Sequence, residues 1–330
     1  MGNWSNYKII LYFASIVTYI LLSASTNKNT LPKWGFQAHK KINRLAIFTL
    51  KGELFRFYKE NIEFITEHAV DPDKRRYIIE NEAPCHFIDI DYFNHIDSIP
   101  KQWDKAILKY GKDTLEKHGI VPWHILHTKY KLQKAFEEKD FEAILRYSSD
   151  IGHYIGDAHV PLHTTKNYNG QLTNQHGIHG LWESRLIELF GDKYNYFTGN
   201  SIYIENPTTF IWKAINSSFN AVDTVLNKEK EISEKIKNKY TYEQKGNLTV
   251  KTYSKEFSEE YHKSLNRMVE RRLRASIIAV GSIWYTAWVD AGQPSLSNLK
   301  NKEINEYLKQ ISLLEKEHKN KTQLGRICEH

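Results

Sequence analysis

The sequence predicts an all-α fold with a single multi-helix domain, and three observations support this prediction. Between residues 34 and 297, apolar residues recur at helical spacing, and almost no stretch alternates apolar and polar residues as a strand would. The eight prolines stand mostly between the periodic segments, where a helical bundle tolerates them. Hydrophobic residues make up 41% of the 330 residues, which excludes wholesale disorder.

Three segments carry the clearest helical periodicity. Residues 40–58 predict a helical region that Gly52 interrupts. Residues 127–147 carry an apolar stripe that begins at Tyr130. Residues 253–289 predict one long amphipathic helix, which a Gly-Gln-Pro sequence terminates shortly afterwards.

Both ends of the chain are expected to lie outside the 34–297 domain. Residues 1–25 contain a lysine, an apolar run of 14 residues and then small residues, which is typical of a secretory signal peptide. A membrane span needs about 20 apolar residues. We therefore expect a secreted or periplasmic protein, with an uncleaved anchor as the alternative. Residues 298–330 are rich in Lys, Glu and Asn and predict a solvated polar extension.

The net charge of +7 does not by itself indicate a nucleic-acid-binding protein. Residues 1–33 and 298–330 contribute +3 and +2, and the remaining weakly positive domain is compatible with a phosphate-bearing substrate. Two cysteines exclude a disulfide scaffold and a four-thiolate zinc site. Fifteen histidines are many for this length and suggest metal chemistry.

Two short motifs carry the strongest chemical signal. The sequence IGHYIGDAHVPLHTT places His153 and Asp157 four residues apart on one helix face, and His163 follows the proline that ends this helix. In HGIHGLWESRL, His179 and Glu183 are again four residues apart. One such pair alone would indicate a surface ion pair, but two pairs with a histidine between them indicate a zinc site.

Together with upstream residues, these motifs resemble the superfamily of zinc-dependent phospholipases C and single-strand-specific zinc nucleases. The ordered set is W-x4-H, D, H-F-I-D, H-Y-I-G-D-x3-P-L-H and H-x3-E, and it covers roughly residues 34–290. The resemblance implies an all-α domain with three zinc ions at the floor of a cleft. We expect a monomer without a stable protein partner.

The resemblance also implies the ligands of each ion. It assigns the first zinc to Asp71, His86, His153 and Asp157, the second to His163, His179 and Glu183, and the third to His39, Asp157 and the backbone of Trp34. Asp73 is an alternative to Asp71. In the family this Trp is the mature N-terminus, whereas a cut after Ser25 would leave residues ahead of Trp34.

Further roles follow from the same resemblance. Asp157 would bridge the first and third ions. Phe87 resembles the aromatic residue on which the nucleases stack a base, and Asp89 resembles the carboxylate that supports a phosphate-binding arginine. Arg75 is the nearest candidate for that arginine, although counting from Asp71 leads to Lys74.

The expected function is zinc-dependent hydrolysis of a phosphodiester, in which metal ions activate water and neutralise phosphoryl oxygens. The step from Trp34 to His39 and the Trp182-Glu183 pair favour a nuclease that acts on single-stranded nucleic acid or 3′-nucleotides. Glu183 in place of Asp resembles the phospholipases instead. The alternatives are a phospholipase C acting on phospholipid head groups and a non-catalytic zinc-binding protein.

Overall fold

The structure is a computed structural model that describes residues 36–245, 248–297, 299, 307, 309–310 and 312–313. The described part is mostly helical, with one two-stranded sheet, which confirms the all-α prediction. The helices belong to one compact unit, and residues 242–251 at the hairpin tip fall outside it. The predicted signal peptide at 1–25 and the proposed ligand Trp34 lie outside the described residues.

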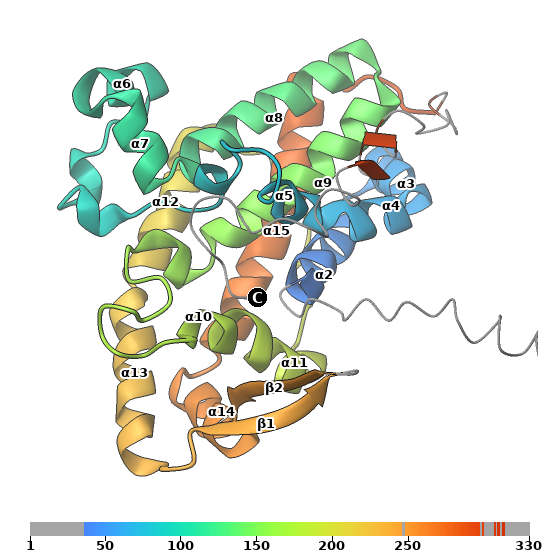
Figure 1. Ribbon diagram of the computed structural model, residues 1–330. Helices are drawn as coiled ribbons and strands as arrows, with labels where there is room; N and C mark the ends of the chain where they lie inside the picture. The colour runs from blue at the N-terminus through green and yellow to red at the C-terminus, as the bar shows by residue number, and fades with distance from the viewer. Residues whose placement is uncertain are drawn as a thin grey trace, which may run out of the picture. The chain divides into compact units, whose positions relative to one another are not determined.

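The helices and strands follow one another along the chain (Figure 1). The first half contains α2 (Phe36–Ala46), η1 (Ile47–Thr49), α3 (Gly52–Glu60), α4 (Ile62–Glu67), η2 (His68–Val70), α5 (Asp71–Arg75), η3 (Ala83–His86), η4 (Ile90–Tyr92), η5 (Ile96–Ser98), α6 (Trp103–Tyr110), α7 (Lys112–His118), α8 (Val121–Glu138) and α9 (Phe141–Ala158). The second half contains η6 (Pro161–Thr164), α10 (Ile178–Gly180), η7 (Leu181–Arg185), α11 (Leu186–Phe190), η8 (Gly191–Lys193), α12 (Pro207–Phe219), α13 (Val222–Lys235), β1 (Tyr240–Lys245), β2 (Leu248–Tyr253), α14 (Lys255–Ser264) and α15 (Met268–Asp290). No helix in these ranges is both long and apolar enough to span a membrane.

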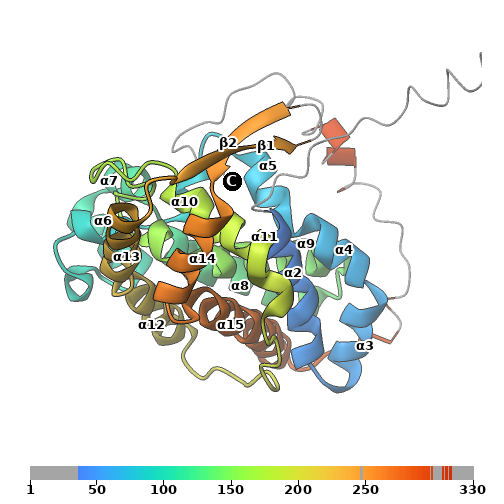
Figure 2. The same ribbon diagram turned by 90° about the horizontal axis from the view of Figure 1, so that it is seen from below.

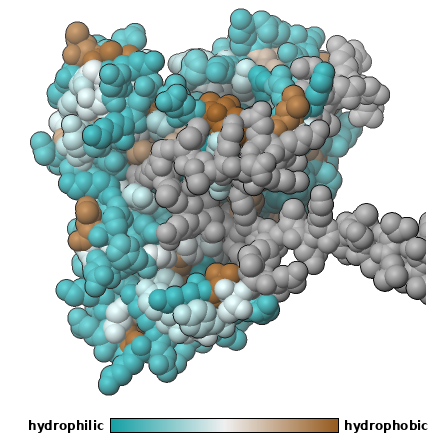
Figure 3. Space-filling model, viewed as in Figure 1, coloured by the Kyte–Doolittle hydropathy of each residue, from teal (hydrophilic) through white to brown (hydrophobic). Residues whose placement is uncertain are grey.

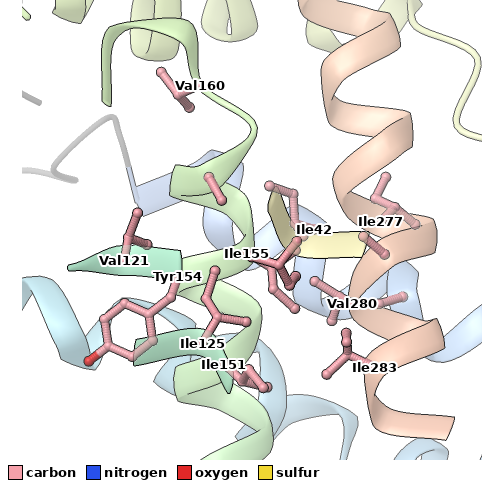
Figure 4. Packing of buried hydrophobic residues seen from close by; sticks show 14 of the residues in the cluster. Ile42, Val121, Ile125, Ile151, Tyr154, Ile155, Val160, Ile277, Val280 and Ile283 are labelled. Atoms are coloured by element: carbon pink, nitrogen blue, oxygen red, sulfur yellow. The ribbon is translucent and has the colours of Figure 1, made fainter. Parts of the chain in front are cut away.

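Helix α9 organises the core because it packs against α8, α2, α4 and α15. Figures 1 and 2 show α2 beside α4 and α9 from two directions. Ile155 of α9 lies near Ile42 of α2 and Val280 of α15, and all three side chains are buried (Figure 4). Tyr154 points to the other side of α9, so its hydroxyl lies away from this aliphatic cluster.

Two glycines let α2 approach α9 closely. A Cβ at Gly152 would lie 1.9 Å from Asn43 Oδ1, and one at Gly156 would lie 2.9 Å from His39 Nδ1. Asn43 Nδ2 donates to the carbonyl oxygen of Ser149 on α9 at 3.0 Å. The small residues on this face of α9 therefore set the depth at which His39 enters the protein.

The C-terminal helical region differs from its prediction. One helix was expected over 253–289, but α14 ends at Ser264 and α15 begins at Met268. Asn266 and Arg267 between them have φ angles of 46° and 59°, a left-handed backbone that cannot continue an α-helix. The predicted end of the helical region is confirmed, because α15 ends at Asp290.

The segment 127–147 is also divided in two. Lys139 adopts the left-handed conformation at the end of α8, and the Asp140 side chain then caps α9 by accepting from the Ala143 amide at 3.1 Å. Tyr130 was expected on the buried stripe, but its side chain is 60% exposed. The interruption predicted at Gly52 is confirmed, since α3 begins there with a φ of 60°.

Two other expectations need correction. The hairpin formed by β1 and β2 was not foreseen, because each strand has only six residues and its alternation of apolar and polar residues, as in Leu248-Thr249-Val250-Lys251, is brief. The extension at 298–330 was expected to be solvated, but Tyr307 is only 3% exposed. Its hydroxyl donates to Asp71 Oδ2 at 2.7 Å, so this part of the extension packs onto the domain.

Substitution of Gly152 by Ala should lower the free energy of unfolding by about 1–3 kcal/mol, because the new methyl group would overpack the α2–α9 contact. Thermal and urea denaturation of the variant would measure the loss. The double variant Gly152→Ala/Asn43→Ala should lose less than the sum of the two single variants, since the second change opens the space. Strictly additive losses would show that the contact does not limit packing here.

Candidate metal centre

Eight buried side chains converge within the helical unit, and they come from seven successive segments of the chain. They form four overlapping groups, in each of which the ligand atoms lie within 4.8 Å of one another: His39, Asp73 and His153; His86, His153 and Asp157; His163, His179 and Glu183; His39, Asp157 and Glu183. The segments that supply them include α2, α5, η3 and α9, followed by η6, α10 and η7. The structure therefore brings together seven of the nine predicted metal ligands.

Asp157 lies between two of these groups. Its Oδ2 is 2.9 Å from His86 Nδ1 and 3.3 Å from His153 Nε2. Its Oδ1 is 3.4 Å from Nε2 of His39, whose ring stacks on that of His153 with centroids 3.9 Å apart. One carboxylate thus faces histidines on both sides, which is the geometry that the predicted bridging role requires.

Glu183 occupies the corresponding place in the other half of the cluster. Its Oε2 is 2.7 Å from His179 Nε2 and 3.4 Å from His163 Nε2, while its Oε1 is 3.5 Å from His39 Nε2. His179 and Glu183 are four residues apart, and the chain between them passes from α10 into the π-helical turn η7. Such turns are frequent at functional sites.

Backbone carbonyls fix the orientation of three imidazole rings. Their Nδ1 atoms donate to carbonyl oxygens: His153 to Ala69 at 2.9 Å, His163 to His86 at 2.6 Å and His179 to Tyr168 at 3.2 Å. With a carbonyl behind Nδ1, Nε2 is the nitrogen that faces the carboxylates: in the neutral ring it has the lone pair that a metal ion would take, and in the protonated ring it donates to a carboxylate. A hydrogen bond of this kind behind each ring is characteristic of metal-ligating histidines.

Several buried nitrogen and oxygen atoms at the centre are arranged as metal ligands would be, and they lack the hydrogen bonds that buried polar atoms normally make. Both ring nitrogens of His39, Asp157 Oδ1 and Glu183 Oε1 have no hydrogen-bond partner among the described residues. A buried polar group without a partner costs about 1–3 kcal/mol. The donor set consists of imidazole nitrogens and carboxylate oxygens, which is the chemistry that zinc accepts.

The histidines also determine the protonation state of the two central acids. Burial would raise the pKa of Asp157, but the charges of His153 and His163 outweigh burial and hold this pKa well below its ordinary value. Glu183 behaves in the same way: burial opposes ionisation, while hydrogen bonds from His163 and His179 lower its pKa well below normal. Both groups are therefore carboxylates, the form that binds a cation.

Asp73, and not Asp71, belongs to the cluster. Asp73 Oδ1 lies 3.6 Å from His153 Nε2 and 3.7 Å from His86 Nδ1. The Asp71 carboxylate instead accepts from His68 at 2.6 Å, from Tyr307 at 2.7 Å and from Lys74 at 2.9 Å. Residues two apart on the short helix α5 point to opposite sides, so only one of the two acids can face the ligands.

The Arg76 guanidinium lies beside the cluster, although the sequence did not single out this residue. Arg76 is fully buried, and its Nη1 lies 3.7 Å from Asp73 Oδ1. Arg75, the predicted phosphate-binding residue, is held by Glu82 at 3.2 Å and by Asp150 at 3.1 Å. Counting three residues from Asp73 rather than from Asp71 would have led to Arg76.

The other two substrate candidates are placed differently from expectation. The Phe87 side chain is only 5% exposed, so its ring has little free face for stacking on a base. Asp89 was expected to support Arg75, but its Oδ2 lies 3.4 Å from His118 Nδ1, and Glu82 and Asp150 are the acids that hold Arg75. The sequence placed Phe87 and Asp89 by their distance from His86, which says nothing about which way their side chains turn.

Comparison with known proteins adds no family to this description. No protein-family model matches the sequence, and a search of curated proteins also finds no match. The function of the protein is therefore inferred from the residues of the cluster and their geometry.

Asp73→Asn should lower the metal content of the purified protein, because this change removes a charged oxygen beside His86 and His153. Asp71→Asn is the matched control and should leave the metal content per folded molecule unchanged. Elemental analysis would measure the metal content. Equal metal loss in both variants would contradict the assignment of Asp73.

In the wild-type protein, added zinc at about 100 times its Kd should raise the free energy of unfolding by about 2.7 kcal/mol.

Proposed function

We propose that this protein is a zinc-dependent phosphodiester hydrolase of the phospholipase C and zinc nuclease type, and that its substrate is single-stranded nucleic acid or a 3′-nucleotide. The observation that supports the proposal most directly is the position of Asp157, with histidines against both of its oxygens. A single structural zinc needs four ligands, whereas eight candidate ligands in overlapping groups suit several ions. Clustered ions are typical of enzymes that act on phosphate esters.

Zinc bound in this cluster would lower the pKa of water and neutralise charge on the phosphoryl oxygens. The residues of the chain would supply the negative charge that holds such ions and a hydrogen-bond donor for the phosphate. Asp157 and Glu183 hold negative charge at the centre in their ionised forms. Arg76 is fully buried beside Asp73, so a phosphate would reach its planar guanidinium only through the centre itself, where such a group can donate two parallel hydrogen bonds. No serine or cysteine nucleophile is required by this arrangement.

We favour nucleic acid over phospholipid because the five-residue step from Trp34 to His39 and the Trp182-Glu183 pair resemble the nucleases. On the part of the surface that Figure 3 shows in colour, hydrophilic residues predominate and the hydrophobic residues lie in small separate patches. This coloured part shows no large contiguous apolar patch of the kind that marks a membrane-binding site. Export of the protein stays a prediction from the pattern of residues 1–25. The monomeric state is also still a prediction.

A chelator should abolish hydrolysis of single-stranded DNA by the purified protein, and added zinc should restore it. The rate on a double-stranded substrate and on phosphatidylcholine, measured in the same preparation, distinguishes the nuclease from the phospholipase. A zinc-loaded, folded protein that hydrolyses no phosphodiester would support the non-catalytic alternative instead.

Arg76→Gln should lower kcat/KM for a phosphodiester by about 100-fold, the magnitude expected when one charge-stabilising donor is lost. Arg76→Lys keeps the charge without the forked geometry and should recover only part of the rate. Metal content serves as the control, since a loss of zinc in Arg76→Gln would mean that Arg76 acts through Asp73 and not on the substrate.

A further inference from the structure

A cavity lined by residues of α8, α9 and the C-terminal extension lies beside the candidate metal centre. Its volume is about 510 Å³, and its walls include Lys131 of α8 and Arg146 of α9. Tyr307 from the C-terminal extension lines it as well. Arg75, the arginine predicted to bind phosphate, also lines it.

The inner end of this cavity contacts a metal-ligand candidate. Glu82 Oε1 lies 3.6 Å from His86 Nε2, and the Tyr154 ring meets the His86 ring edge-on with centroids 5.3 Å apart. The Tyr154 hydroxyl in turn bonds to Glu82. A ligand in the cavity would therefore lie one side chain away from the metal centre.

Positive charge exceeds negative charge on the walls. The two acids that line the cavity, Glu82 and Asp150, are both bound to Arg75. Lys131 and Arg146 have no ion pair with any described residue, and they flank one ring: Lys131 Nζ lies 5.9 Å and Arg146 Cζ 4.6 Å from the Tyr147 centroid. Two cations without acidic partners at one cavity are suited to an anion.

Lys134, another lysine of α8, differs from Lys131 in that it has an acidic partner. Lys134, which is three residues after Lys131 on α8, pairs with Glu138 at 3.5 Å and does not line the cavity. Surface lysines on this helix can therefore find a carboxylate, whereas Lys131 faces Arg146 and Tyr147 instead.

We propose that Lys131 and Arg146 form a subsite for a second phosphate group of a polyanionic substrate, so that this cavity binds the chain of a single-stranded nucleic acid next to the reacting phosphodiester. The inference rests on the proposed function. Arg146 and His153 are seven residues apart on α9, which corresponds to about 10 Å at 1.5 Å per residue. A phospholipid has a single phosphodiester and would leave this subsite without a ligand.

The test measures binding of metal-loaded, full-length protein to a fluorescent phosphorothioate single strand, which resists cleavage, at a series of salt concentrations. Each phosphate contact with a single strand contributes about 0.7 to the slope of log affinity against log salt. Lys131→Gln/Arg146→Gln, which removes both cations from this one phosphate, should reduce the magnitude of the slope by about 0.7, and Lys131→Gln alone should reduce it by less. Lys134→Gln is the matched control and should leave the slope unchanged.

Two further measurements distinguish the outcomes. The double variant should hydrolyse a small diester, bis(p-nitrophenyl) phosphate, at the wild-type rate, because this substrate has one phosphate. An unchanged salt slope in a double variant with the wild-type melting temperature would overturn the subsite. The subsite would also be overturned if the double variant lost binding to phosphatidylserine vesicles but still bound the strand like the wild type. That result would assign the two cations to a membrane surface. Failure of wild-type protein to cleave any diester, with the slope change present, would refute only the hydrolase and leave the subsite supported.

Discussion

The burial of two carboxylates among five histidines is the constraint on which the rest of this structure depends. Asp157 and Glu183 are ionised in a solvent-poor interior, where an isolated charge would be very costly. The imidazoles around them offset part of this cost, and atoms that still lack hydrogen-bond partners mark where a cation fits. Several helices must therefore meet within a few ångströms, although their sequences are far apart.

Helix α9 meets this requirement through its composition. His153 and Asp157 point toward the cluster, while Gly152 and Gly156 remove the side chains that would hold α2 away. On the remaining faces, Ile151 and similar residues pack into the aliphatic core. One helix thus supplies ligands, a close helix contact and hydrophobic burial, because 3.6 residues per turn separate these functions onto different faces.

The helix α5 and the C-terminal extension connect this centre with its surroundings. Asp73 faces the metal-ligand candidates, whereas Asp71 binds Tyr307 of the extension. The same tyrosine lines the cavity that contains Lys131 and Arg146. A segment outside the predicted domain therefore helps to build the surface beside the centre, and its composition alone suggested only a solvated tail.

The sequence by itself determined the all-α class and most of the side chains that meet in the cluster, because helical periodicity and the four-residue spacing in each His–carboxylate pair are local properties. It did not determine which acid of α5 turns inward, that Arg76 rather than Arg75 lies at the cluster, or that Phe87 is buried. It also missed the break at Asn266, since only the backbone conformation shows it. These features were decided by tertiary packing, because the direction of a side chain depends on the neighbours that distant segments bring to it.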